Sequence, residues 1–174
     1  MSSGVRRSAP PDHAAAGPWH NAPMRPAVRG AESRDLDVLL RLVEQFQEFE
    51  RIPFDGAAAR QHLARLLHEP PLGQVLLAEL DGRAIGYAIL TYGYDLEFGG
   101  MDAYLTDLFL EDAQRDRGHG TWLLGEVEKA ARRAGVKAVH LMVAPSNHRA
   151  HHVYYRAGFR ASPRLFLTKL LATD

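Results

Sequence analysis

The chain has 174 residues, of which 46% are apolar and 24% are charged. These values are typical of one globular domain and leave little room for a second. No apolar run reaches the roughly 18 residues of a membrane-spanning helix, and the first residues lack the apolar core of a signal peptide. We therefore expect no membrane contact and a cytoplasmic location. The chain lacks cysteine, which excludes disulfides, thiolate metal ligands and cysteine nucleophiles.

The charges are sorted along the chain, although the formal net charge is zero and gives no reason to expect a nucleic-acid partner. Residues 84–114 contain six acidic residues and no Lys, Arg or His, whereas residues 115–169 contain eleven Lys or Arg and three acids. Such sorting can steer a cation to one region and an anion to another. It is equally compatible with chance on a solvated surface.

Apolar spacing divides the chain into an extension and one domain. Residues 1–23 are rich in Pro, Ala, Ser and Gly, and we predict that they form a disordered extension before a single domain over residues 24–174. The 3.6-residue pattern predicts four helices, over residues 36–46, 56–67, 123–134 and 150–157. Alternation and turn residues predict six strands, over residues 27–29, 74–80, 83–92, 102–110, 136–143 and 165–170. This order indicates an α/β (α+β) fold with a mixed, mostly antiparallel central sheet flanked by helices.

Two predicted connections and one predicted strand contain several of the candidate functional residues discussed below or lie next to them. Asp81-Gly82 is a favoured two-residue hairpin turn, whereas residues 93–101 are expected to form a looser loop. Strict alternation over residues 102–110 predicts one face made of Ala103, Leu105, Asp107 and Phe109. The opposite face then carries Tyr104, Thr106, Leu108 and Leu110.

The stretch from Arg115 to Thr121 reads Arg-Asp-Arg-Gly-His-Gly-Thr and leads directly into a helical pattern. A helix start exposes unpaired N–H groups, and glycines allow phosphate oxygens to approach them. A simple turn needs only one glycine, so the pair Gly118 and Gly120 beside two arginines favours a pyrophosphate site. No Gly-Lys-Ser/Thr follows, and Leu123 stands where a dinucleotide fingerprint needs glycine.

A second motif, made of Asn147, Ala150, Tyr154, Gly158 and Phe159, lies one predicted strand further on. Together the two motifs resemble those of the GCN5-related N-acetyltransferases (GNAT), whose fold this resemblance implies for roughly residues 24–171. The family's cofactor loop, Arg/Gln-x-x-Gly-x-Gly/Ala, is matched at Arg115, Gly118 and Gly120. Its later motif, Asn-x-x-Ala-x-x-x-Tyr-x-x-x-Gly-Phe, is matched at Asn147, Ala150, Tyr154, Gly158 and Phe159.

The resemblance implies acetyl-CoA as co-substrate. It places the pantetheine arm along the backbone of a strand, the pyrophosphate in the glycine loop, and Tyr154 near the thioester. The implied cofactor-binding residues are Leu108, Phe109, Leu110, Arg115, Arg117, Gly118, His119, Gly120, Thr121 and Asn147. His119 departs from the family, which usually has an aliphatic residue between the two glycines.

The transfer chemistry assigns roles to two further side chains. A primary amine has a pKa of about 10.4 and must lose a proton before it attacks a thioester. Asp107 is the candidate base, directly or through water, if burial raises its pKa, and it is an equally good anchor for the amine's charge. Tyr154 is the candidate acid for the departing thiolate. Thr106 and Glu97 are the further candidate substrate-binding residues.

The expected reaction is acetyl transfer to a primary amine of a small cationic molecule, by direct attack in a ternary complex. A protein lysine or N-terminal acetyltransferase and a catalytically silent acyl-CoA-binding module stay open as alternatives. His148 and His152 have the spacing of a zinc pair, but no acid or cysteine joins them, so we expect no metal site. Dimers are common among the proteins that this chain resembles, so the resemblance implies a homodimer as one possible assembly.

Overall fold

The computed structural model describes residues 26–171. One sheet has the strand order β1-β2-β3-β4-β5, formed by Ala27–Gly30, Gly73–Leu80, Arg83–Asp95, Gly100–Leu110 and Ala138–Leu141. The first four strands are antiparallel neighbours, and β5 runs parallel to β4. The predicted mixed, mostly antiparallel sheet is therefore confirmed. The extension predicted over residues 1–23 lies outside the described residues.

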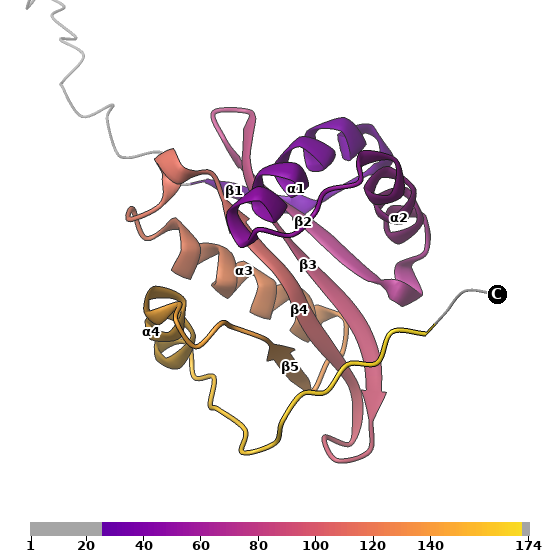
Figure 1. Ribbon diagram of the computed structural model, residues 1–174, viewed down its shortest axis with the longest axis vertical. Helices are drawn as coiled ribbons and strands as arrows, with labels where there is room; N and C mark the ends of the chain where they lie inside the picture. Colours follow the sequence, from indigo (N-terminus) through magenta and orange to yellow (C-terminus); the bar gives the residue numbers. More distant parts are fainter. Residues whose placement is uncertain (1–25, 172–174) are drawn as a thin grey trace, which may run out of the picture.

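Helices cover both faces of this sheet (Figure 1). The helical elements are η1 (Ser33–Asp35), α1 (Leu36–Glu50), α2 (Gly56–His68), η2 (Pro70–Leu72), η3 (Asp112–Gln114), α3 (His119–Arg133) and α4 (His148–Arg156). On the α1/α2 face, Leu39 and Leu63 pack into one buried cluster with Tyr87. On the α3/α4 face, Leu124 packs into another with Leu90. Within residues 26–171, no helix is long and apolar enough to cross a membrane.

The hairpin between β3 and β4 is tighter than the sequence predicts. Gly93 pairs with Asp102 and Asp95 with Gly100, so only four residues, 96–99, form the turn. A Cβ atom on Gly93 would lie 2.5 Å from Asp102 Oδ1. The predicted loose loop over residues 93–101 is therefore wrong, because a glycine lets the strands stay paired against a buried carboxylate.

A β-bulge interrupts β4 at Thr106. Ile89 pairs with Asp107 while the next residue of β3, Leu90, pairs with Leu105, which leaves Thr106 as the extra residue. Leu105 belongs to the cluster under α3, whereas Phe109 belongs to the cluster under α1 and α2. The prediction that Leu105 and Asp107 share a face is wrong, since the bulge reverses the alternation between them. Asp107 faces the α1/α2 side with Phe109.

The C-terminal part of the chain also differs from the prediction. Residues 165–170 form no strand, and their large side chains are exposed. The strand predicted over residues 136–143 is shortened to Ala138–Leu141. A strand forms only where a neighbour satisfies its backbone, and residues 165–170 have no strand neighbour within the described part of the chain.

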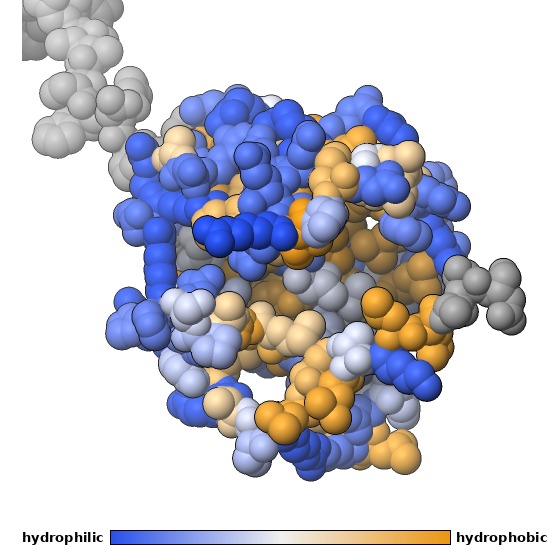
Figure 2. Space-filling view, in the orientation of Figure 1, coloured by the Kyte–Doolittle hydropathy of each residue, from blue (hydrophilic) through white to orange (hydrophobic). Residues whose placement is uncertain are grey.

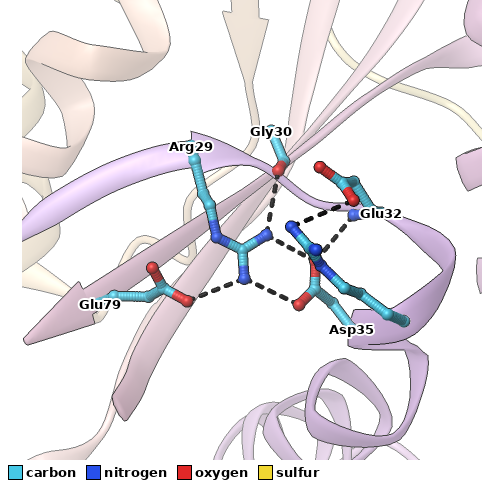
Figure 3. A network of polar contacts seen from close by, with 6 residues as sticks. Arg29, Gly30, Glu32, Asp35 and Glu79 are labelled. Carbon is cyan, nitrogen blue, oxygen red and sulfur yellow. Dashed lines mark hydrogen bonds and ion pairs between the residues drawn. The ribbon is translucent and has the colours of Figure 1, made fainter. Parts of the chain in front are cut away.

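A network of charges fixes the entry of the chain into α1 (Figure 3). Arg29 on β1 donates to both carboxylate oxygens of Asp35, at 2.6 and 2.8 Å, and to Glu79 on β2 at 2.8 Å. The backbone N–H of Glu32 donates to the same Asp35 carboxylate at 2.8 Å. The hydrogen bonds from Arg29 are the main reason that the pKa of Asp35 falls to about 2.

Candidate cofactor and acceptor site

The strands β4 and β5 separate halfway along β4. They pair only where Asp102–Leu105 meets Ala138–Leu141. β4 continues to Leu110, so the backbone polar groups on that edge of residues 106–110 face no strand within the described part of the chain. A ligand can bind these groups as a strand would. This stretch contains Leu108, Phe109 and Leu110, the three residues that the resemblance assigns to the pantetheine arm.

The glycine loop ends at the exposed start of α3. Gly118 is the N-cap in the left-handed region, with φ of 79°, and no side chain among residues 26–171 caps the helix. Gly120 lies within the first turn, where an added Cβ atom would meet, among the described residues, only Leu110 Cδ1, at 4.0 Å. The fold therefore needs glycine at 118 but not at 120. The uncapped N–H groups and the missing Cβ suit an anion such as a pyrophosphate.

The two arginines of this loop have different environments. Arg115 turns inward: its Nε donates to the carbonyl of Leu110 at 3.0 Å, and its guanidinium lies 4.4 Å from the centre of the Phe49 ring. Asp112 pairs with the same guanidinium at 2.5 Å. Arg115 thus links β4, α1 and the loop. Arg117 is exposed beside the helix start.

Three further residues of the implied cofactor set surround this region. His119 is the first residue of α3, and its buried Nδ1 has no hydrogen-bond partner among the described residues. Thr121 lies exposed in the same helical turn. Asn147 is the N-cap of α4, because its Oδ1 accepts a hydrogen bond from the backbone N–H of Ala150 at 3.0 Å. Asn147 therefore has a structural function whether or not it also contacts a ligand.

Tyr154 lies on α4 and packs against the cluster of the α3/α4 face, which contains Leu105. Its ring makes an edge contact with Phe159, with centroids 5.8 Å apart. Burial raises the pKa of the Tyr154 phenol above its ordinary value, and the charge of Glu50 adds to this effect. The phenol therefore keeps its proton at neutral pH, as a proton donor must.

Asp107 lies on the other face of the sheet, bonded to a tyrosine. The Tyr87 hydroxyl donates to Asp107 Oδ2 at 2.8 Å, and the Tyr87 side chain is completely buried. Burial raises the pKa of Asp107, and hydrogen bonds from Tyr87 and Thr106 oppose the rise. Tyr87 is the site residue that the sequence analysis missed. The two residues are 20 positions apart, so only the register of β3 against β4 could have revealed the pair.

The two remaining predicted substrate-binding residues, Thr106 and Glu97, lie far apart in the structure. Thr106 sits at the bulge next to Asp107, with its Oγ1 donating to the carbonyl of Ile89 at 3.4 Å. Glu97 lies in the hairpin turn and pairs with Arg164 at 2.6 Å. The rise of about 3.3 Å per strand residue puts Glu97 roughly 20 Å from Asp107. The structure thus brings Thr106 and Asp107 together and leaves Glu97 apart.

Solved structures share this fold. An integron cassette protein from the mobile metagenome of Cole Harbour Salt Marsh aligns with a TM-score of 0.75 and 31% identity, over 84% of this chain and 91% of that chain. A predicted acetyltransferase from Clostridium acetobutylicum, crystallised with acetyl-CoA, aligns with a TM-score of 0.71 and 17% identity, over 83% and 96% of the two chains. The architecture is therefore one that acetyltransferases use.

Sequence comparison identifies the family. The model of the acetyltransferase (GNAT) family matches residues 39–159. Thialysine N-epsilon-acetyltransferase from Bos taurus is 25% identical over 140 residues, which cover 75% of this chain and 82% of the relative. The chain belongs to the GNAT family and is an N-acetyltransferase, as the two motifs implied.

Proposed function

We propose that the protein transfers the acetyl group of acetyl-CoA to a primary amine of a small cationic acceptor, by direct attack in a ternary complex. The opening between β4 and β5 is the observation that carries this proposal. Asp107 borders it from one face of the sheet, and Tyr154 packs against the other face. A ligand in the opening would therefore have a carboxylate on its acceptor side and a phenol on its cofactor side.

Several groups of the chain support the proposal of a coenzyme A site. The backbone of residues 108–110 would bind the pantetheine arm through the groups that remain open beside the Leu110 carbonyl, which accepts from Arg115. The N–H groups around Gly118, Gly120 and Thr121 would bind the pyrophosphate, with the exposed Arg117 adding positive charge. When bound, acetyl-CoA supplies the acetyl thioester. The acetyl-CoA complex of the Clostridium acetobutylicum protein supports this choice of co-substrate.

Asp107 is the proposed proton acceptor for the acceptor amine. Its burial favours the protonated carboxyl group, so its raised pKa lies closer to that of an amine than an exposed carboxylate's would. Tyr87 holds one carboxylate oxygen at 2.8 Å and so fixes its orientation. Before the transfer, the same negative charge would attract the cationic amine.

Tyr154 is the proposed proton donor to the leaving sulfur, because its phenol remains protonated at neutral pH. The open backbone N–H groups of β4 would stabilise negative charge on the acyl oxygen. Direct attack fits a chain with no cysteine to form an acyl-enzyme.

A cationic acceptor fits the charge of the acceptor side. Of the acids in residues 84–114, Glu97, Glu111 and Asp112 pair with arginines. The negative charge proposed for the acceptor side is therefore that of Asp107. The bovine relative's name gives thialysine, an amine, as its substrate. These two observations favour a small amine over a protein.

The test is to follow thiol release from acetyl-CoA with polyamines, aminoglycosides, lysine analogues and peptides. We expect release that depends on a small amine, and a fall on the order of 100-fold in Asp107→Asn. Asp37→Asn, which changes an exposed carboxylate on α1, is the matched control and should keep wild-type activity. Turnover of peptides alone would instead indicate a protein acetyltransferase. Acetyl-CoA binding without turnover of any amine would indicate the silent module.

A further inference from the structure

A cavity opens beside α2 on the α1/α2 face of the sheet. Its volume is about 420 Å³, and its lining residues are His62, Arg65, Leu66, Leu72 and Thr91. This volume is typical of sites that bind small molecules. Figure 2 shows that the molecule is hollowed below α1 and α2, with hydrophobic residues inside the hollow. None of the five lining residues belongs to the cofactor or acceptor residues described above, so the cavity needs an explanation of its own.

The register of β3 against β4 brings this cavity close to Asp107. Asp107 pairs with Ile89, and Thr91 follows two residues further along the same face of β3. Diagonal neighbours of this kind on one face of a sheet lie roughly 7–8 Å apart. An extended lysine, with bonds of about 1.5 Å, spans roughly the same distance from its side-chain amine to its carboxyl carbon. A small acceptor with its amine at Asp107 would therefore have its other end in the cavity.

The wall that α2 contributes carries positive charge and N–H donors. His62, Arg65 and Leu66 lie three and four positions apart, so they share one face of the helix, where His62 and Arg65 are exposed. Glu69 accepts from Nε and Nη2 of Arg65 at 3.0 and 3.4 Å, whereas Nη1 has no partner among residues 26–171. An exposed pair contributes little to stability, so a second carboxylate can share the guanidinium with Glu69.

We propose that this cavity binds a carboxylate of the acceptor, which makes the acceptor a lysine-like molecule with an amine at one end and a carboxylate at the other. The inference rests on the proposed amine acetyltransferase function and names the acceptor class for it. The planar guanidinium of Arg65 suits a carboxylate, and His62 adds an N–H donor. Leu66 and Leu72 would pack against the methylene chain. A polyamine would instead place a second cation beside Arg65, where the two charges repel each other.

The first experiment compares two acceptors that differ only in the carboxylate. Lysine and 1,5-diaminopentane have the same carbon chain and the same two amines. With acetyl-CoA as the donor, we expect kcat/KM for lysine to exceed that for the diamine roughly tenfold, because a hydrogen bond to a charged group contributes on this scale. Equal values, or a preference for the diamine, would overturn the carboxylate site and leave the acetylation of small amines intact.

The second experiment assigns the carboxylate to α2. Arg65→Gln should raise the KM for lysine roughly tenfold and leave kcat and the KM for 1,5-diaminopentane unchanged. Arg60→Gln removes the same charge from an exposed position of the same helix, where Arg60 pairs with Asp37, and it is the matched control. It should keep both KM values. An unchanged KM for lysine in Arg65→Gln, or the same rise in both variants, would overturn the proposal.

The third experiment measures acceptor binding without turnover, by calorimetry on the full chain. The wild type and Arg60→Gln should bind lysine more tightly than 1,5-diaminopentane, and Arg65→Gln should bind the two equally. Equal affinities in the wild type would overturn the carboxylate site even if amines are acetylated. The expected affinities with no turnover of any amine would contradict the proposed acetyl transfer and leave the carboxylate site standing, so the two failures can be told apart.

Discussion

The hydroxyl of Tyr154 can be tested apart from its ring. The ring packs with Phe159 and the core, so Tyr154→Phe should leave the fold unchanged. Loss of the proton donor should lower kcat on the order of 100-fold, with no change in the dissociation constant of coenzyme A. Steady-state kinetics and calorimetry measure the two quantities. Tyr155→Phe makes the same change on an exposed face of α4 and should have no effect; equal rates for both variants would remove Tyr154 from the mechanism.

The hydrogen bond from Tyr87 affects the pKa of Asp107, which predicts an effect on the pH dependence of activity. The Tyr87 hydroxyl donates to the carboxylate, which stabilises the charged form and lowers its pKa against the effect of burial. Tyr87→Phe removes this bond, so the pKa of Asp107 should rise further. The acidic limb of the kcat profile, where the base becomes protonated, should move to higher pH. Tyr92→Phe on the same strand is the control, and an acidic limb that stays in place in Tyr87→Phe would contradict the role.

At the scale of elements, a substitution at the start of α3 should affect the stability of the fold and the binding of a ligand in opposite directions. Gly120→Ala adds a methyl group in ordinary contact with Leu110 and improves helix propensity. It should raise the free energy of unfolding by up to about 1 kcal/mol. It should also weaken coenzyme A binding roughly tenfold, or about 1.4 kcal/mol, by blocking the approach to the backbone.

Gly125→Ala is the matched control for this change. Gly125 lies in the same helix, and no neighbouring atom of the described part of the chain comes within 4 Å of an added Cβ atom. The Gly125→Ala variant should be more stable than the wild type, like Gly120→Ala, but should keep the wild-type affinity for coenzyme A. Urea unfolding and calorimetry measure the two effects. If Gly120→Ala binds coenzyme A as well as Gly125→Ala does, the pyrophosphate does not lie at the start of α3.

The elements also show which features a sequence can predict. The hairpin turn at Asp81-Gly82 and the helix start after Gly118 were predictable, because local residues determine the backbone there. The bulge at Thr106 was not, because it appears only when β4 is paired with β3, and it decides which face Asp107 occupies. Residues 165–170 have the composition of a strand, but a strand also needs a partner that local sequence cannot supply. The residues of the two motifs were recognisable because each motif lies within one short stretch and needs no partner from elsewhere in the chain.

For the whole molecule, the network around Asp35 should govern stability in acid. Arg29 joins β1, η1 and β2 through this carboxylate, whose pKa is lowered from 3.8 to about 2 in the folded chain. A carboxylate with a depressed pKa stabilises the fold above its unfolded pKa. This contribution is therefore complete above about pH 4 and is lost as the pH falls toward 2. At neutral pH it is worth about 2 kcal/mol, because the pKa lies at about 2 in the folded chain instead of 3.8.

Asp35→Asn should accordingly lower the free energy of unfolding by about 2 kcal/mol at pH 7. The difference from the wild type should shrink between pH 4 and pH 2, because the wild-type carboxylate then takes up the proton that Asn mimics. Urea unfolding at a series of pH values measures it. Asp37→Asn, two residues further along and exposed, should differ little from the wild type at any pH. A deficit in Asp35→Asn that stayed constant down to pH 2 would show that packing around residue 35, and not its charge, ties α1 to the sheet.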